Sequence, residues 1–157
     1  MKETLKNVWW KVPLYSAAAG FVSYWIMVGI VGRFVYVKLP DGTVSSNDTL
    51  WMICSAVVFV VVLLIGGLLL FRKMTRKEVF YSATAMVLLN LAMTILSSFL
   101  QHSGISLLIV YTREWYAFIV DLLLKTGLNG WISTAISWAA VYLFVLFGKK
   151  EEANREP

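Results

Sequence analysis

Residues 50–77, LWMICSAVVFVVVLLIGGLLLFRKMTRK, decide the fold. The part from 50 to 71 carries no charged side chain, and a helix needs about 20 predominantly apolar residues to cross the hydrocarbon layer of a bilayer. Four cations follow at once: Arg72, Lys73, Arg76 and Lys77. Lys and Arg are enriched beside the cytoplasmic ends of membrane helices. The stretch therefore predicts a transmembrane helix whose carboxyl end lies in the cytoplasm.

The middle of this stretch, residues 57–64, is almost wholly β-branched or aliphatic and shows no polar face. We therefore expect this helix to present more surface to lipid than the other helices do. Gly66 and Gly67 offer the one place where it can bend or let another element approach closely, because neither residue has a side chain. A tight contact is expected there.

The rest of the chain has the same character. Of its 157 residues, 59% are hydrophobic and only 15% are charged, whereas soluble domains have about 25% charged residues. The apolar residues gather in blocks long enough to cross a bilayer, which predicts an all-α integral membrane protein with four transmembrane helices in one bundle. We expect a single membrane domain, 1–157, with spans at 12–35, 50–71, 79–100 and 128–147.

The positions of the cations predict the orientation of the bundle. Ten of the fourteen Lys and Arg residues fall in segments that are cytoplasmic if both termini are inside: Lys2, Lys6, Lys11, Arg72, Lys73, Arg76, Lys77, Lys149, Lys150 and Arg155. The other four are Arg33, Lys38, Arg113 and Lys125. This bias predicts a multi-pass protein of the cell (inner) membrane with both termini and the charged tail, 148–157, in the cytoplasm. It also accounts for the net charge of +5 without a nucleic-acid partner.

The segment 105–125 has two interpretations. Within 112–126 an apolar stripe containing Trp115 opposes a polar side containing Asp121, which is typical of an amphipathic helix at the membrane surface. Such a helix, interfacial or re-entrant, would place Trp115 at the outer interface and end near Gly127, a residue suited to a helix C-cap. The alternative is a fifth span with Arg113 and Glu114 near its middle, where two charges would cost several kcal/mol.

A polar stripe runs along the third span. Asn90, Thr94 and Ser98 are four residues apart and therefore share one helix face. Side chains of this kind hold membrane helices together by hydrogen bonds, and the small-residue faces of the first and last spans are suited to receive them. The alternative is that the stripe lines a polar path or binds a small ligand.

A second candidate group lies on the outer side: Arg33, Arg113, Glu114 and Asp121. Glu114 and Asp121 are candidates for the acid and base of an interfacial enzyme, although such residues are more often the wet face of an amphipathic helix. Arg33 lies close enough to the end of its span for its guanidinium to reach the headgroups.

Other chemistry has no support in the sequence. Cys54 is the only cysteine and His102 the only histidine, so neither a disulfide nor a transition-metal site is expected. The four spans contain no acidic residue, which argues against proton-coupled export. We find no phosphate-binding loop or nucleophile elbow, and we expect no cofactor and no enzymatic activity.

These observations favour a non-enzymatic membrane protein that acts through helix–helix contact. It would be an accessory or regulatory subunit with a membrane-protein partner, or it would self-associate in the lipid bilayer. The first alternative is a small channel or transporter that uses the polar face of the third helix, with Arg33 and Arg113 attracting anions at the outer mouth. A third hypothesis is that the chain is an interfacial enzyme acting on lipid through Glu114 and Asp121.

Overall fold

The computed structural model describes residues 8–99 and 105–150. Predictions that concern Leu100, His102 and the tail beyond Lys150 lie outside the described residues.

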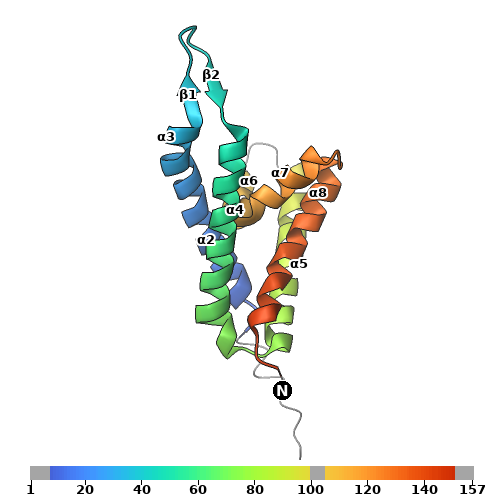
Figure 1. Cartoon of the computed structure of the whole chain (residues 1–157). Helices are drawn as coiled ribbons and strands as arrows, with labels where there is room; N and C mark the ends of the chain where they lie inside the picture. Colours follow the sequence, from blue (N-terminus) through green and yellow to red (C-terminus); the bar gives the residue numbers. More distant parts are fainter. Residues whose placement is uncertain (1–7, 100–104, 151–157) are drawn as a thin grey trace, which may run out of the picture.

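Four long helices make up the bundle (Figure 1). The first consists of α2 (Lys11–Trp25), η1 (Ile26–Val31, a π-helix) and α3 (Gly32–Val35). The second consists of α4 (Asp48–Ile65), η2 (Gly66–Leu70, a π-helix) and η3 (Phe71–Lys73, a 3-10 turn). The third is α5 (Arg76–Phe99), and the fourth joins α8 (Gly130–Ser137) to η5 (Trp138–Phe147, a 3-10 helix).

All four helices are long and apolar enough to cross a membrane. Their bounds follow the predicted spans closely. The largest difference is at the start of the third helix, which was expected at 79 and begins at Arg76. The second helix is the least buried of the four, as its aliphatic middle predicted.

The helices begin and end at residues that satisfy their free backbone groups. Asn47 Oδ1 accepts the backbone N–H of Leu50 at 3.0 Å. Thr75 and Glu78 form a capping box, with Glu78 Oε2 accepting from Thr75 N at 2.8 Å and Thr75 Oγ1 accepting from Glu78 N at 3.3 Å. Gly127, at φ +87°, ends the helix before it as predicted, and its N–H donates to a carbonyl three residues back.

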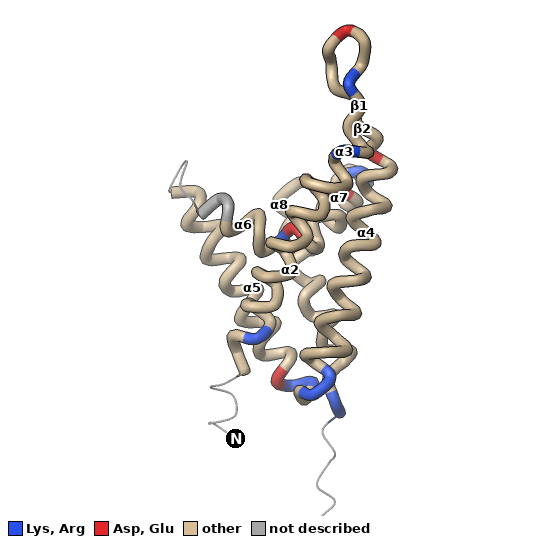
Figure 2. The backbone as a smooth tube through the Cα atoms, turned by 90° about the vertical axis from the view of Figure 1, so that its left-hand side faces the viewer, with Lys and Arg blue, Asp and Glu red and all other residues tan. Residues whose placement is uncertain are grey.

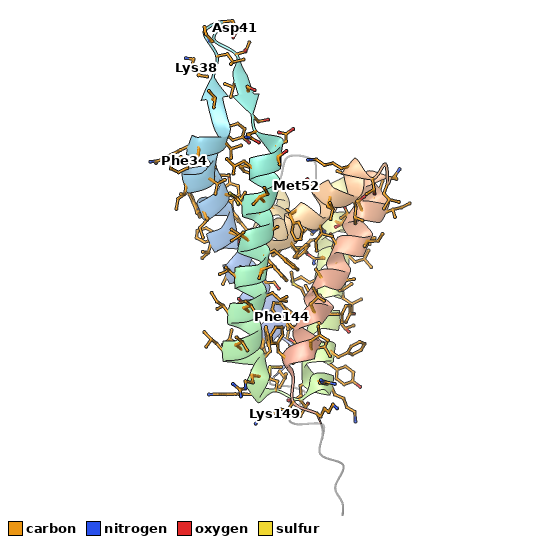
Figure 3. All side chains as sticks on the ribbon, in the orientation of Figure 1. Phe34, Lys38, Asp41, Met52, Phe144 and Lys149 are labelled. Carbon is orange, nitrogen blue, oxygen red and sulfur yellow. The ribbon has the colours of Figure 1, made fainter. Side chains whose placement is uncertain are left out.

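A β-hairpin stands clear of the bundle at one end (Figure 1). Its strands are β1 (Tyr36–Lys38) and β2 (Val44–Ser46), paired antiparallel, and Lys38 and Asp41 mark its outer part in Figure 3. Gly42 at φ +85° makes the turn. The Thr43 hydroxyl and amide both donate to Asp41 and thereby hold the pKa of that carboxyl below its usual value. The turn was predicted, but the strands were not, because three residues each are too few to show a period.

The opposite end of the bundle is basic. Both ends of the described chain lie there (Figure 1), and Lys and Arg gather around it (Figure 2). The loop between the second and third helices and the first residue of the third are bound at this end to the segment just after the fourth helix, since Lys149 N donates to Met74 O at 2.8 Å and Arg76 N donates to Lys149 O at 3.0 Å. Figure 3 shows Lys149 at this place.

The segment between the third and fourth helices is where the structure corrects the sequence analysis. An amphipathic helix, interfacial or re-entrant, was expected over 112–126, and only the later part of that range forms one continuous helix. The chain forms α6 (Ile105–Arg113), a 3-10 turn η4 (Glu114–Tyr116) and α7 (Ala117–Lys125). The turn lies inside the bundle, where η4 packs against α2 and α4.

Aromatic packing explains why the turn is buried. Trp115, expected at the outer interface, is 0% exposed. Its ring stacks on Phe59 with centroids 5.6 Å apart and lies 5.4 Å from the ring of Phe144. Figure 3 shows Phe144 between the second and fourth helices. Aromatic pairs of this kind are worth about 0.5–1.5 kcal/mol beyond the area that they bury, which favours the core over the surface for this turn.

The segment 105–125 can enter the bundle because the backbone of α6 approaches that of α2 closely. Gly20 lies on the buried small-residue face of α2, and a Cβ at this position would overlap the carbonyl group of Tyr111 in α6. Similarly, a Cβ at Gly66 would come within 2.5 Å of the ring of Tyr15. The tight packing predicted at Gly66 and Gly67 is therefore confirmed.

Gly20→Ala tests the role of this approach. The added methyl group meets backbone rather than a movable side chain, so α6 must shift, and we expect a loss of about 1–3 kcal/mol in the free energy of unfolding in detergent. Gly29→Ala is the matched control, because a Cβ there has nothing within 4 Å. Equal stability of the two variants would contradict the packing described.

Candidate functional site

Asn90 lies at the centre of a polar cluster inside the bundle. The side chain is 0% exposed and projects from α5 toward η4. Its Nδ2 donates to the Tyr116 hydroxyl at 3.0 Å, and Tyr116 is also fully buried. A buried amide without such a partner would cost about 1–3 kcal/mol, so this pair fixes η4 against α5.

The guanidinium of Arg113 completes the cluster. Its Nη2 donates to the Asn90 carbonyl oxygen at 3.0 Å and to Thr94 Oγ1, and its Nε lies 3.5 Å from Asn90 Oδ1. The guanidinium carbon lies 5.2 Å from the ring centroid of Trp138, a cation–π distance. Every one of these partners is neutral. The positive charge is therefore held by dipoles and by an aromatic face.

The cluster lies near mid-height of the bundle. Asn90 is nine residues before Phe99, the last described residue of α5, which at 1.5 Å per residue is about 14 Å along the helix. Trp138 is eight residues after Gly130, the start of α8, or about 12 Å. Arg113 was predicted on the solvent-exposed face of a surface helix. The structure instead places it within the bundle, because Asn90 and Thr94 supply hydrogen-bond acceptors there.

The predicted outer charge group is not one site. Among the described residues, no carboxylate lies within ion-pair distance of Arg113, whose partners are Asn90, Thr94 and Trp138. Arg33 is exposed in α3, which directly precedes the first strand of the hairpin. Asp121 instead lines a separate cleft of about 310 Å³. The acid–base role of Glu114 and Asp121 stays a prediction.

The predicted polar stripe is brought together in part. Asn90 and Thr94 join the cluster, while Ser98 is exposed and donates to the Thr94 carbonyl within its own helix at 3.0 Å. Outside α5, the hydrogen-bond partners of Asn90 and Thr94 come from residues 113–116 rather than from the first and last helices. Tyr116 and Trp138 were missed, because no spacing links them to Asn90 along the chain.

A groove opens beside the guanidinium. Its volume is about 660 Å³, and it is lined by Thr94, Arg113, Val120, Leu124, Asn129, Gly130, Trp131 and Thr134. These residues come from α5, α6, α7, α8 and the turn before α8. The lining contains one charged side chain, Arg113, and that charge is positive.

In comparisons with known proteins, no family model, curated protein or solved structure matches the chain. The structure itself defines the class. The protein is all-helical apart from its short hairpin and has four helices long and apolar enough to span a membrane. Between the third and fourth of them, α6 ends at a cationic side chain, Arg113, and is followed by a helical turn that lies inside the bundle.

Asn90→Leu tests the cluster. The substitution leaves the buried Tyr116 hydroxyl without its partner and removes one acceptor from Arg113, so we expect about 1–3 kcal/mol less stability in denaturant titrations in detergent. Ser98→Ala is the matched control and should change stability by less than about 0.5 kcal/mol. If Asn90→Leu is no more destabilising than this control, the cluster does not hold η4 in place.

Proposed function

We propose that this chain is a non-enzymatic accessory subunit of a complex in the cell (inner) membrane, with its amino and carboxyl termini in the cytoplasm. The observation that carries the proposal is the charge of Arg113, which lies at mid-height of the bundle and has no carboxylate partner in the described chain. The cations gathered where both ends of the described chain lie support the orientation.

The energetics favour an external partner. In a bilayer whose hydrocarbon layer is about 30 Å thick, a side chain 12–14 Å from the helix ends by the rise per residue lies within that layer. A guanidinium there costs about 2.5–3.5 kcal/mol even by the most permissive scale. Neutral acceptors and Trp138 offset part of this cost, and a counter-charge from a second protein would offset more.

The internal use of the polar stripe supports the same view. Asn90 and Thr94 already have partners inside the chain, so neither side chain is free to hold another protein. Recognition of a partner within the membrane layer then falls to Arg113, whose Nη1 has no hydrogen-bond partner among the described residues. The accessory role would then depend on a specific contact at Arg113 rather than on non-specific association of apolar surfaces.

Purification of the tagged full chain from its native membranes in a mild detergent tests the proposal. We expect a second membrane protein in a constant ratio to the chain, retained through size-exclusion chromatography. Recovery of the chain alone, as a monomer or as a homo-oligomer, would overturn the accessory role.

The second candidate is an anion channel or transporter, and the groove of about 660 Å³ that reaches Arg113 favours it. Vesicles reconstituted with the pure chain would then show anion flux, and Arg113→Gln would remove it because the attracting charge is lost. Lys125→Gln is the matched control, since Lys125 lines the separate outer cleft. Vesicles without flux would exclude this candidate.

A further inference from the structure

Arg113 lines the groove, and its guanidinium has hydrogen-bonding capacity that the described residues do not use. The described contacts of the guanidinium use Nε and Nη2, and Nη1 has no partner among the residues the structure describes. Trp138, which stacks against the same guanidinium, has a buried Nε1 that is also without a partner in that part of the chain. A negatively charged acceptor in the groove would accept a hydrogen bond from Nη1 and would balance the charge of the guanidinium.

One wall of the groove is suited to a helix. Gly130 and Thr134 both line it, and they are four residues apart on α8. Ala135 and Ala139 are exposed farther along the same helical span. Small residues at this spacing let a second helix approach closely in a membrane.

Depth decides between sources of negative charge. Trp138 is about 12 Å from the start of α8 by the rise per residue, whereas the phosphates of lipids lie in the headgroup layer outside the hydrocarbon. A carboxylate on a transmembrane helix is delivered at mid-span by the helix itself. Such intramembrane charges characteristically pair with one another.

We propose that the groove binds one transmembrane helix of a partner protein, and that an Asp or Glu near the middle of that helix pairs with Arg113. This inference rests on the proposed accessory function. The partner helix lies along the Gly130–Thr134 face of α8, and its carboxylate accepts hydrogen bonds from Nη1. The small residues of α8 allow the partner helix to approach closely, and the guanidinium supplies the charge complementary to its carboxylate.

A defined peptide tests this pairing. The full chain carries a fluorescent donor in phosphatidylcholine vesicles, and a leucine-rich transmembrane peptide of about 20 residues carries an acceptor dye and one central Asp. A second peptide has Asn in place of that Asp. We expect energy transfer to show about tenfold tighter association of the Asp peptide, which corresponds to about 1.4 kcal/mol, and loss of this preference in Arg113→Gln.

Two more variants keep the test decisive. Lys125→Gln removes a cation outside the groove and should keep the full preference for the Asp peptide. Thr134→Leu narrows the groove without touching a group that binds the guanidinium, and it should weaken association of the Asp peptide even if Arg113→Gln does not fold. Equal association of the Asp and Asn peptides, or unchanged association of the Asp peptide in Thr134→Leu, overturns the inference.

The same variants separate this inference from the function on which it rests. If Arg113→Gln still brings down the stoichiometric second protein from native membranes, the accessory role stands and the site assigned here is wrong. If the natural chain brings down no second protein, the accessory role itself fails. Anion flux that depends on Arg113, without a preference for the Asp peptide, would overturn the inference in favour of a free anion.

Discussion

A guanidinium in the middle of an apolar bundle needs acceptors, and the bond from Arg113 to the backbone carbonyl of Asn90 supplies the central one. That carbonyl also accepts from the Thr94 hydroxyl at 2.7 Å, so a single point on α5 gathers three polar groups. For Arg113 to reach it, the chain between the third and fourth helices must enter the bundle. The bare backbone at Gly20 and the aromatic contacts of Trp115 serve that entry.

The long helices were predictable because the signal that defines them is local. A block of apolar residues between turns and cations specifies a membrane-length helix whatever surrounds it, and the four predicted spans matched the observed helices. Helix caps such as Thr75 with Glu78 are equally local. The segment 105–125 was not predictable in this way. Its burial depends on Phe59 and Phe144, which are far away in the sequence and meet Trp115 only in the fold.

The residues of the candidate site also differ in whether a local sequence pattern could predict them. The four-residue spacing of Asn90 and Thr94 placed them on one face correctly, but the pattern carried no information about what that face meets. Arg113 was assigned to the surface by a sound rule, that charges avoid the apolar layer. The rule fails here because it assumes lipid as the surroundings, whereas amide and hydroxyl groups of α5 and the indole of η5 surround this charge.

The order of these groups along the chain has a consequence for biosynthesis. Asn90 and Thr94 leave the ribosome before Arg113, but Trp138 follows Arg113 by 25 residues (138 − 113), which at about 5–20 residues per second is a delay of about 1–5 s. During that interval the residues of α5 that accept from the guanidinium have been synthesised, whereas the indole that contacts it has not. The fourth helix is therefore the last part of the site to be synthesised, and the indole of Trp138 is the last of these groups to become available to the guanidinium.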